Sequence, residues 1–156
     1  MQRLKPNSYG VLAITAVVAA QSSHYLLSED HTVKRDSEAM KLRTKNFALR
    51  VLRLCRSLPR TQEARILGGQ LLRSSTSVAA NYRAACRSRS RAEFIAKLGI
   101  VLEEADETEF WLELIREAAL FPPAKLQSLC KEAHEIVSIF VSSVRTAKGL
   151  PLQSDL

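Results

Sequence analysis

Apolar and small side chains recur at every third or fourth position along most of this chain, which is the spacing of helices that bury one face. The pattern is clearest between Gln70 and Glu117, where two such stripes flank a short turn rich in serine and arginine. The stripes consist of Leu67, Leu71, Ser74, Val78, Asn81 and Ala85, and then Phe94, Leu98, Val101, Ala105, Thr108, Leu112 and Ile115. This stretch predicts a helical hairpin.

Capping and breaking residues divide the chain into further helices. Ser90 followed three residues later by Glu93 is a capping box, so a helix should begin near Arg91. Pro59 and the Pro122-Pro123 pair interrupt any helix that reaches them. The expected helices are 41–57, 61–87, 91–120 and 124–147. Short connections force successive helices to lie antiparallel, which predicts an all-α, up-down-up-down four-helix bundle over residues 40–148.

Two adjacent glycines stand inside the second helix. Gly68 and Gly69 each lower helix stability by about 1 kcal/mol relative to alanine. A close approach by a neighbouring helix, or a local bend, would explain their presence. Small residues are frequent further along the same helix, which favours tight packing there.

The first 39 residues allow two interpretations. Arg3 and Lys5 precede the apolar run 11–20, a pattern typical of a secretory signal peptide, although the run is too short to span a bilayer. Alternatively, Met40 is the natural start and residues 1–39 are an upstream extension. We expect a disordered extension outside the bundle, a frayed tail at 149–156, and a cytoplasmic protein without membrane contact.

No catalytic, cofactor or metal site is expected. Cys55, Cys86 and Cys130 are odd in number and show no ligand spacing. His134 lacks the carboxylate three residues earlier that a ferritin-like di-metal site requires. The sequence contains no phosphate-cradling glycine loop and no spacing typical of a nucleophile with its base. We therefore expect a protein that is not an enzyme.

Charge is strongly segregated within the net charge of +7. Residues 40–60 contain seven basic residues and no acidic one, residues 65–97 seven basic against one acidic, and residues 98–120 seven acidic against one basic. Arginine clusters on the first two helices suit the phosphates of RNA or DNA. The predicted nucleic-acid-binding residues are Arg43, Arg50, Arg53, Arg60, Arg83, Arg87, Arg89 and Arg91. In the alternative interpretation the last four of these arginines form a solvated helix end and pair with Glu103, Asp106 and Glu107 on a neighbouring helix or subunit.

The hairpin sequence QLLRSSTSVAANYRAACRSRSRAEFIAKLGIVLEEADETEFWLELI resembles the four-helix-bundle proteins encoded by 23S ribosomal RNA intervening sequences. The resemblance covers about residues 40–148. That family is similar to the accessory variability determinant of diversity-generating retroelements, a basic ring-shaped pentamer that binds nucleic acid. The resemblance implies a homopentameric accessory factor that binds RNA or DNA, with a reverse transcriptase as a candidate partner. The alternative is an oligomeric interaction or scaffold module without nucleic acid.

Segregated charge also predicts self-association. A positive and a negative face on one compact bundle would satisfy each other on different subunits, and such head-to-tail contacts close into rings when the rotation allows. The number five comes from the resemblance, because charge alone fits other ring sizes. The predicted interface residues are Glu103, Asp106, Glu107, Glu113 and Arg73, with Arg53 and Arg83 as further partners.

Overall fold

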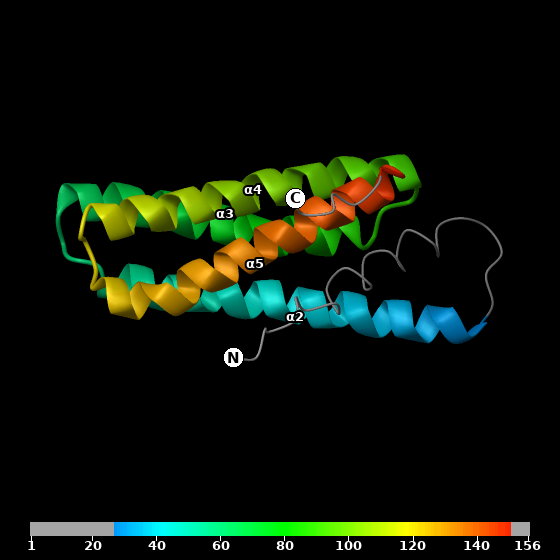
Figure 1. Ribbon diagram of the computed structural model, residues 1–156, viewed down its shortest axis with the longest axis horizontal. Helices are drawn as coiled ribbons and strands as arrows, with labels where there is room; N and C mark the ends of the chain where they lie inside the picture. Colours follow the sequence, from blue (N-terminus) through cyan, green and yellow to red (C-terminus); the bar gives the residue numbers. More distant parts are fainter. Residues whose placement is uncertain (1–26, 151–156) are drawn as a thin grey trace, which may run out of the picture.

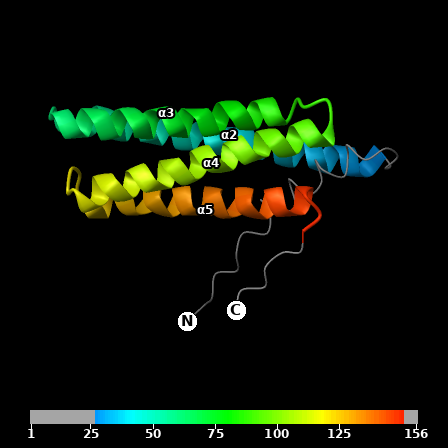
Figure 2. The ribbon, with the colours of Figure 1, turned by 90° about the horizontal axis from the view of Figure 1, so that it is seen from above.

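Four helices form a bundle in the computed structural model, which describes residues 27–150, with side chains from residue 35 onward. They are α2 (Leu27–Ser57), α3 (Gln62–Ala85), α4 (Arg91–Glu117) and α5 (Pro123–Ala147), and this part of the chain contains no strand. Each helix packs on its predecessor, and α5 returns to touch α2 (Figures 1 and 2). The prediction of an antiparallel four-helix bundle is confirmed.

The buried side chains follow the predicted stripes. Every member of the α4 stripe, from Phe94 to Ile115, is buried, and α2 contributes Phe47, Val51 and Leu54. Leu126, Leu129, Ala133, Ile136, Phe140 and Val144 are buried on α5. Burial of these aliphatic and aromatic side chains is the main favourable contribution to folding.

The stripe on α3 differs from the predicted one near its end. Tyr82 is buried at 1% exposure, whereas Asn81 lies half-buried at the border of the core. Tyr82 lies four residues after Val78 and so continues the same face, and its ring packs on Phe140 with centroids 5.4 Å apart. Tyr82, a large amphipathic residue, thus lies in the core where the sequence pattern placed Asn81.

The start of α2 corrects the sequence prediction. The helix begins at Leu27, not near Lys41, so residues 27–39 are helical and the expected disorder is wrong for them. This segment contains no glycine or proline, and its polar residues are compatible with an exposed helix. Ser37 and Met40 are buried against the bundle. The signal-like run at 11–20 and the tail at 151–156 lie outside the described residues, and the boundary at residue 40 stays a prediction.

Gly68 occupies a close contact between α2 and α3. A Cβ atom at this position would lie 2.9 Å from Leu58 Cδ1, and the Cys55 thiol donates to the Gly68 carbonyl at 3.3 Å. The predicted close approach is therefore correct for Gly68. Gly69 is exposed, and a Cβ there would meet nothing within 4 Å.

Candidate nucleic-acid interface

The turn between α3 and α4 presents two arginines at one end of the bundle. Ser90 Oγ accepts from the Glu93 N–H at 3.2 Å, and the Glu93 carboxylate accepts the Arg89 N–H at 2.8 Å. These bonds fix the start of α4 at Arg91, as predicted. Lys97, and next the Arg89 N–H, hold the pKa of Glu93 below its ordinary value. The side chains of Arg87 and Arg89 are exposed on this turn.

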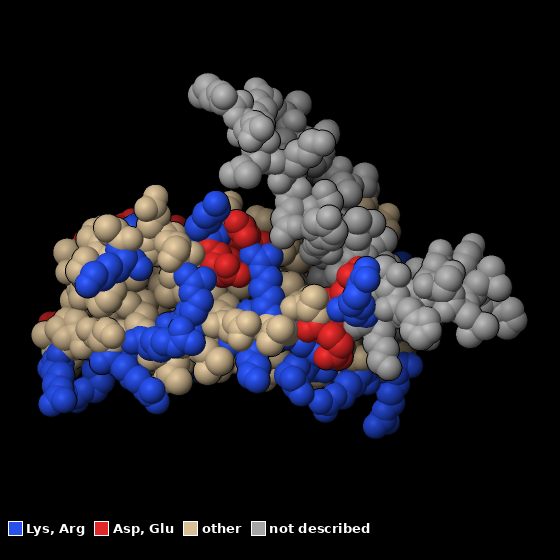
Figure 3. All heavy atoms as spheres, turned by 90° about the horizontal axis from the view of Figure 1, so that it is seen from below, with Lys and Arg blue, Asp and Glu red and all other residues tan. Residues whose placement is uncertain are grey.

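Exposed lysines and arginines gather along α2 and α3. Figure 3 shows lysines and arginines in a row along one long edge of the molecule. By helical periodicity, Lys45 and Arg56 lie on the outer side of α2 next to α3, and Arg65 and Arg83 lie on the adjoining side of α3. We call this surface the basic edge. None of its members has an ion pair with a residue that the structure describes. The members are Lys45, Arg56, Arg60, Arg65, Arg83, Arg87 and Arg89.

Arg43 and Arg50 lie on the other side of α2 and join it to α5. Arg43 Nε is 2.7 Å from Glu132 and its Nη2 is 2.6 Å from Glu135. Burial acts to lower the pKa of Arg43, but the bonds to these carboxylates outweigh it and raise the pKa. Arg50 donates to Ser128 at 3.0 Å and lies 3.6 Å from Glu132. The α2 arginines predicted to bind nucleic acid are therefore divided, because Arg43 and Arg50 are engaged within the bundle while Arg53 is exposed.

Arg91 also has a structural contact. Its guanidinium donates to the Ala147 carbonyl from Nη2 at 2.9 Å and from Nε at 3.2 Å. Ala147 is the last residue of α5, where the helix leaves carbonyl groups without partners and favours a cation. This contact separates Arg91 from the two unpaired arginines of the turn.

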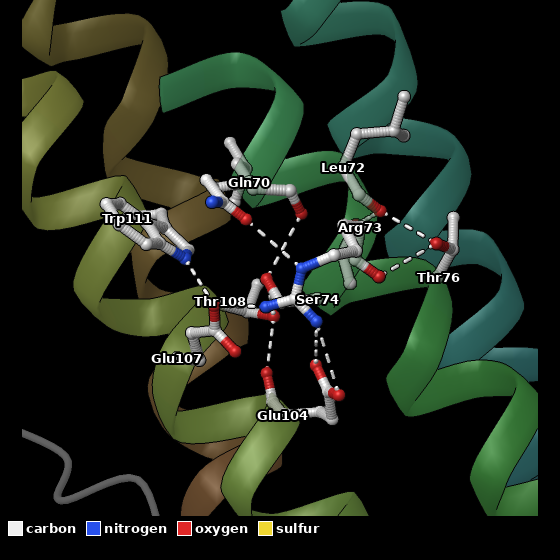
Figure 4. Close-up of polar contacts among 11 residues, drawn as sticks. Gln70, Leu72, Arg73, Ser74, Thr76, Glu104, Glu107, Thr108 and Trp111 are labelled. Atoms are coloured by element: carbon white, nitrogen blue, oxygen red, sulfur yellow. Dashed lines mark hydrogen bonds and ion pairs between the residues drawn. The ribbon is translucent and has the colours of Figure 1, made fainter. Parts of the chain in front are cut away.

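The α3–α4 contact pairs two residues of the predicted oligomer interface, Arg73 and Glu107, within one chain. Arg73 lies 3.4 Å from Glu104 and forms a second ion pair with Glu107, which also accepts from Trp111 Nε1 at 2.9 Å (Figure 4). The hydrogen bond from Arg73, and next that from Trp111, lowers the pKa of Glu107. Arg73 and Glu107 thus satisfy each other inside one chain. The premise that opposite charges can pair only across subunits is wrong.

A buried hydroxyl pair lies beneath these ion pairs. Thr108 Oγ1 is 2.9 Å from Ser74 Oγ and 2.7 Å from the Glu104 carbonyl oxygen (Figure 4). Both side chains are almost fully buried, and Ser74 Oγ also donates to the Leu71 carbonyl oxygen of its own helix at 3.3 Å. Shifting α3 along α4 by a turn would break the contact between the two hydroxyls, while each keeps its bond to a carbonyl of its own helix.

The outer face of α4 carries an aromatic residue that the sequence argument missed. Phe110 is 48% exposed and packs beside Trp111, with ring centroids 5.0 Å apart. Glu103, Asp106 and Glu113 share this outer face and have no ion pair with any residue that the structure describes. The sequence did contain a signal for this surface, because Phe110 does not fall on the helical spacing of the buried stripe. We call Phe110 with these three carboxylates the acidic patch.

Among the side chains that the structure describes, residues 35–150, there is no cluster of the kind that a metal site requires. No three His, Cys, Asp or Glu side chains in this range come close enough to hold a metal ion. His134 is exposed and lies 2.9 Å from Glu109. None of the four helices combines the length and apolar character needed to cross a bilayer.

Comparison with known proteins identifies relatives of this fold. A family model described as 23S rRNA-intervening sequence protein matches residues 36–142. A crystal structure from Bacteroides thetaiotaomicron, described as a protein of unknown function from the S23 ribosomal protein family, is 36% identical with a TM-score of 0.64. That comparison covers 70% of this chain and 97% of the other. No curated protein matches the chain.

Proposed function

We propose that this chain, which belongs to the family of 23S rRNA-intervening sequence proteins, binds the phosphate backbone of RNA or DNA. It does so as an accessory factor without catalysis. Its basic edge makes no ion pair with any residue that the structure describes. The family name points to a context that involves RNA, and the resemblance to retroelement accessory proteins, with a reverse transcriptase as partner, stays a prediction. The observation that carries the proposal is the row of exposed cations that have no carboxylate partner among the described side chains.

The spacing of these cations suits an extended polyanion. Arg60 lies in the turn after α2 and Arg89 in the turn after α3, so the basic edge reaches from one end of the bundle to the other. Guanidinium groups match phosphate oxygens with paired hydrogen bonds. Binding through such contacts is indifferent to sequence and depends steeply on salt.

A salt series tests this proposal. We expect affinity for a labelled duplex or single strand, measured by fluorescence anisotropy, to fall about a thousandfold between about 50 and 200 mM salt if six or more phosphates are contacted. Replacing Arg87 and Arg89 by serine should reduce the salt slope on duplex DNA by about 0.9 for each phosphate that the variant no longer neutralises.

Arg91→Ser is the matched control, because Arg91 contacts a backbone carbonyl. It should lower thermal stability and leave the salt slope unchanged. Nucleic-acid affinity that is absent, or that is insensitive to salt, would refute the proposal.

Self-association is the second candidate function, supported by two exposed surfaces. On α2, Leu42 and Leu49 are 57% and 40% exposed, with Lys45 between them. The acidic patch with Phe110 lies on α4, which is not a packing neighbour of α2. The two surfaces therefore face different directions, and a head-to-tail contact between copies would join apolar centres and opposite charges. We propose that such contacts close into a homo-oligomeric ring, with five subunits as the resemblance implies.

A further inference from the structure

The end of α2 and the start of α5 lie together at one end of the bundle (Figure 1), and residues of both helices line a shallow groove there. Its volume is about 320 Å³. Leu54, Leu126 and Leu129, which line it, are each at most 7% exposed and give it an apolar floor. Phe121, which is half-buried, also lines the groove.

Three cations surround this apolar floor. Arg50 is held in place by its bond to Ser128 and its contact with Glu132. Arg53 and Lys125 are exposed and pair with no carboxylate in the part of the chain that the structure describes. Since Ser128 accepts from Arg50, its own hydroxyl proton is available to a ligand. The rim therefore offers guanidinium, ammonium and hydroxyl donors around an apolar centre.

The start of α5 adds to the positive potential of the groove. Pro122 provides no side-chain cap, Pro123 has no N–H, and the first turn of α5 contains no acidic residue. The partial positive charge of this helix end is thus not compensated by a side chain. The start of α5 therefore adds to the positive charge of the rim.

We propose that the groove binds one nucleotide unit of a single-stranded nucleic acid. The phosphate contacts Arg50, Arg53 and Lys125, and the base lies against Phe121 and the leucine floor. Aromatic side chains stack on bases without regard to sequence, and a paired base inside a duplex does not offer its face in this way. The inference rests on the proposed nucleic-acid binding and adds to it a preference for unpaired strands.

The test compares single-strand and duplex oligonucleotides of equal length with two variants, by fluorescence anisotropy. Phe121→Leu keeps an apolar side chain and removes the stacking ring, so single-strand affinity should fall at least about fivefold while duplex affinity is unchanged. Lys125→Ser should weaken single-strand binding and reduce its salt slope by about 0.7. Lys131→Ser, an exposed lysine of α5 outside the groove, is the control and should change neither.

The outcomes separate this inference from the proposed function. If the wild-type protein binds single strands and Phe121→Leu binds them equally well, with unchanged helicity by circular dichroism, the groove assignment is wrong and backbone binding stands. If the wild-type protein binds neither probe, the proposed function itself fails. A nucleoside monophosphate should compete with the single strand better than the nucleoside does, and equal competition would contradict the phosphate contacts.

Discussion

Ala119 is the non-glycine residue with a positive φ, 52°, in the described part of the chain. It follows α4, and the Leu120 N–H returns to the Ile115 carbonyl at 3.1 Å. The end of α5 repeats this bond from Leu150 to Arg145, there with Gly149 at φ 72°. Helices often end in this way, and glycine is favoured in the left-handed position because it has no Cβ.

Ala119→Gly should therefore stabilise the protein, by up to about 1 kcal/mol after the greater freedom of glycine in the unfolded chain is subtracted. Urea unfolding followed by circular dichroism measures the change. Ala118→Gly is the control, since Ala118 has φ −73° and the substitution there should destabilise. A loss of stability in Ala119→Gly would contradict the strain argument.

The Arg73–Glu107 ion pair should contribute to the pH dependence of stability. The pKa of Glu107 is lowered in the folded state, so its contribution is present above the ordinary value of 4.5 and is lost as pH falls through the lowered folded pKa. Arg73→Gln should lower the free energy of unfolding at neutral pH only slightly, because water screens an exposed ion pair, and should reduce the loss of stability on acidification.

Urea titrations at neutral pH and near pH 3 provide the measurement. Arg116→Gln, at an exposed arginine whose carboxylate contact is 4.0 Å, should leave the acid loss as in the wild type. An equal acid loss in Arg73→Gln and wild type would show that the ion pair makes no contribution.

The sequence could indicate on which side of its helix each arginine lies, but not which residue its guanidinium contacts. Arg43 and Glu132 are 89 residues apart in the chain, and Arg91 and Ala147 are 56 apart. Their pairing depends on how each helix is rotated against a neighbour that is distant in sequence. Composition gives the total charge and cannot separate the unpaired Arg87 from the engaged Arg91.

At the scale of helices, the ends with chemical signals were predictable. Ser90 and Glu93 marked the start of α4, and Pro59 and Pro122 lie just outside helix ends. The start of α2 was not predictable in the same way, because a polar helix on the surface and a disordered linker have similar compositions. Burial of Ser37 and Met40 is a tertiary property that residue types do not reveal.

The two glycines of α3 should respond differently to alanine. Gly69→Ala should stabilise the protein by up to about 1 kcal/mol, since the position is exposed and helical and the new Cβ meets nothing. Gly68→Ala should gain less or destabilise, because its Cβ would press on Leu58 at 2.9 Å. Thermal and urea unfolding of both variants measure the difference. Equal gains would show that the α2–α3 contact adjusts freely.

At the scale of the whole molecule, the ring proposal predicts a specific sensitivity to Phe110. Light scattering at moderate salt should give a mass above that of one chain, and Phe110→Ser should shift the assembly toward monomers at the same concentration. Val141→Ser, which shortens a side chain 39% exposed on α5, should leave the mass unchanged. A wild-type monomer at micromolar concentration would exclude the ring, and an assembly indifferent to Phe110→Ser would exclude this interface.

The contact between α2 and α5 has a consequence for how the bundle opens. α5 crosses α2 obliquely and meets it over a short stretch, whereas the other neighbouring pairs pack along most of their length (Figure 1). The ion pairs of Arg43 and Arg50 bridge this seam. The seam between α2 and α5 is therefore the least closely packed side of the bundle, and ion pairs help to hold it together.

We expect local unfolding to begin where α2 meets α5. Ionic strength weakens partly exposed ion pairs more than buried apolar contacts, so amide hydrogens of α2 should exchange with solvent faster as salt rises, while those of α3 and α4 keep their protection. Mass spectrometry after deuterium labelling resolves the helices separately. α2 also carries Lys45 and Arg56 of the basic edge. A polyanion bound there would contact the helix expected to open first, so its binding should change the rate at which the amide hydrogens of α2 exchange.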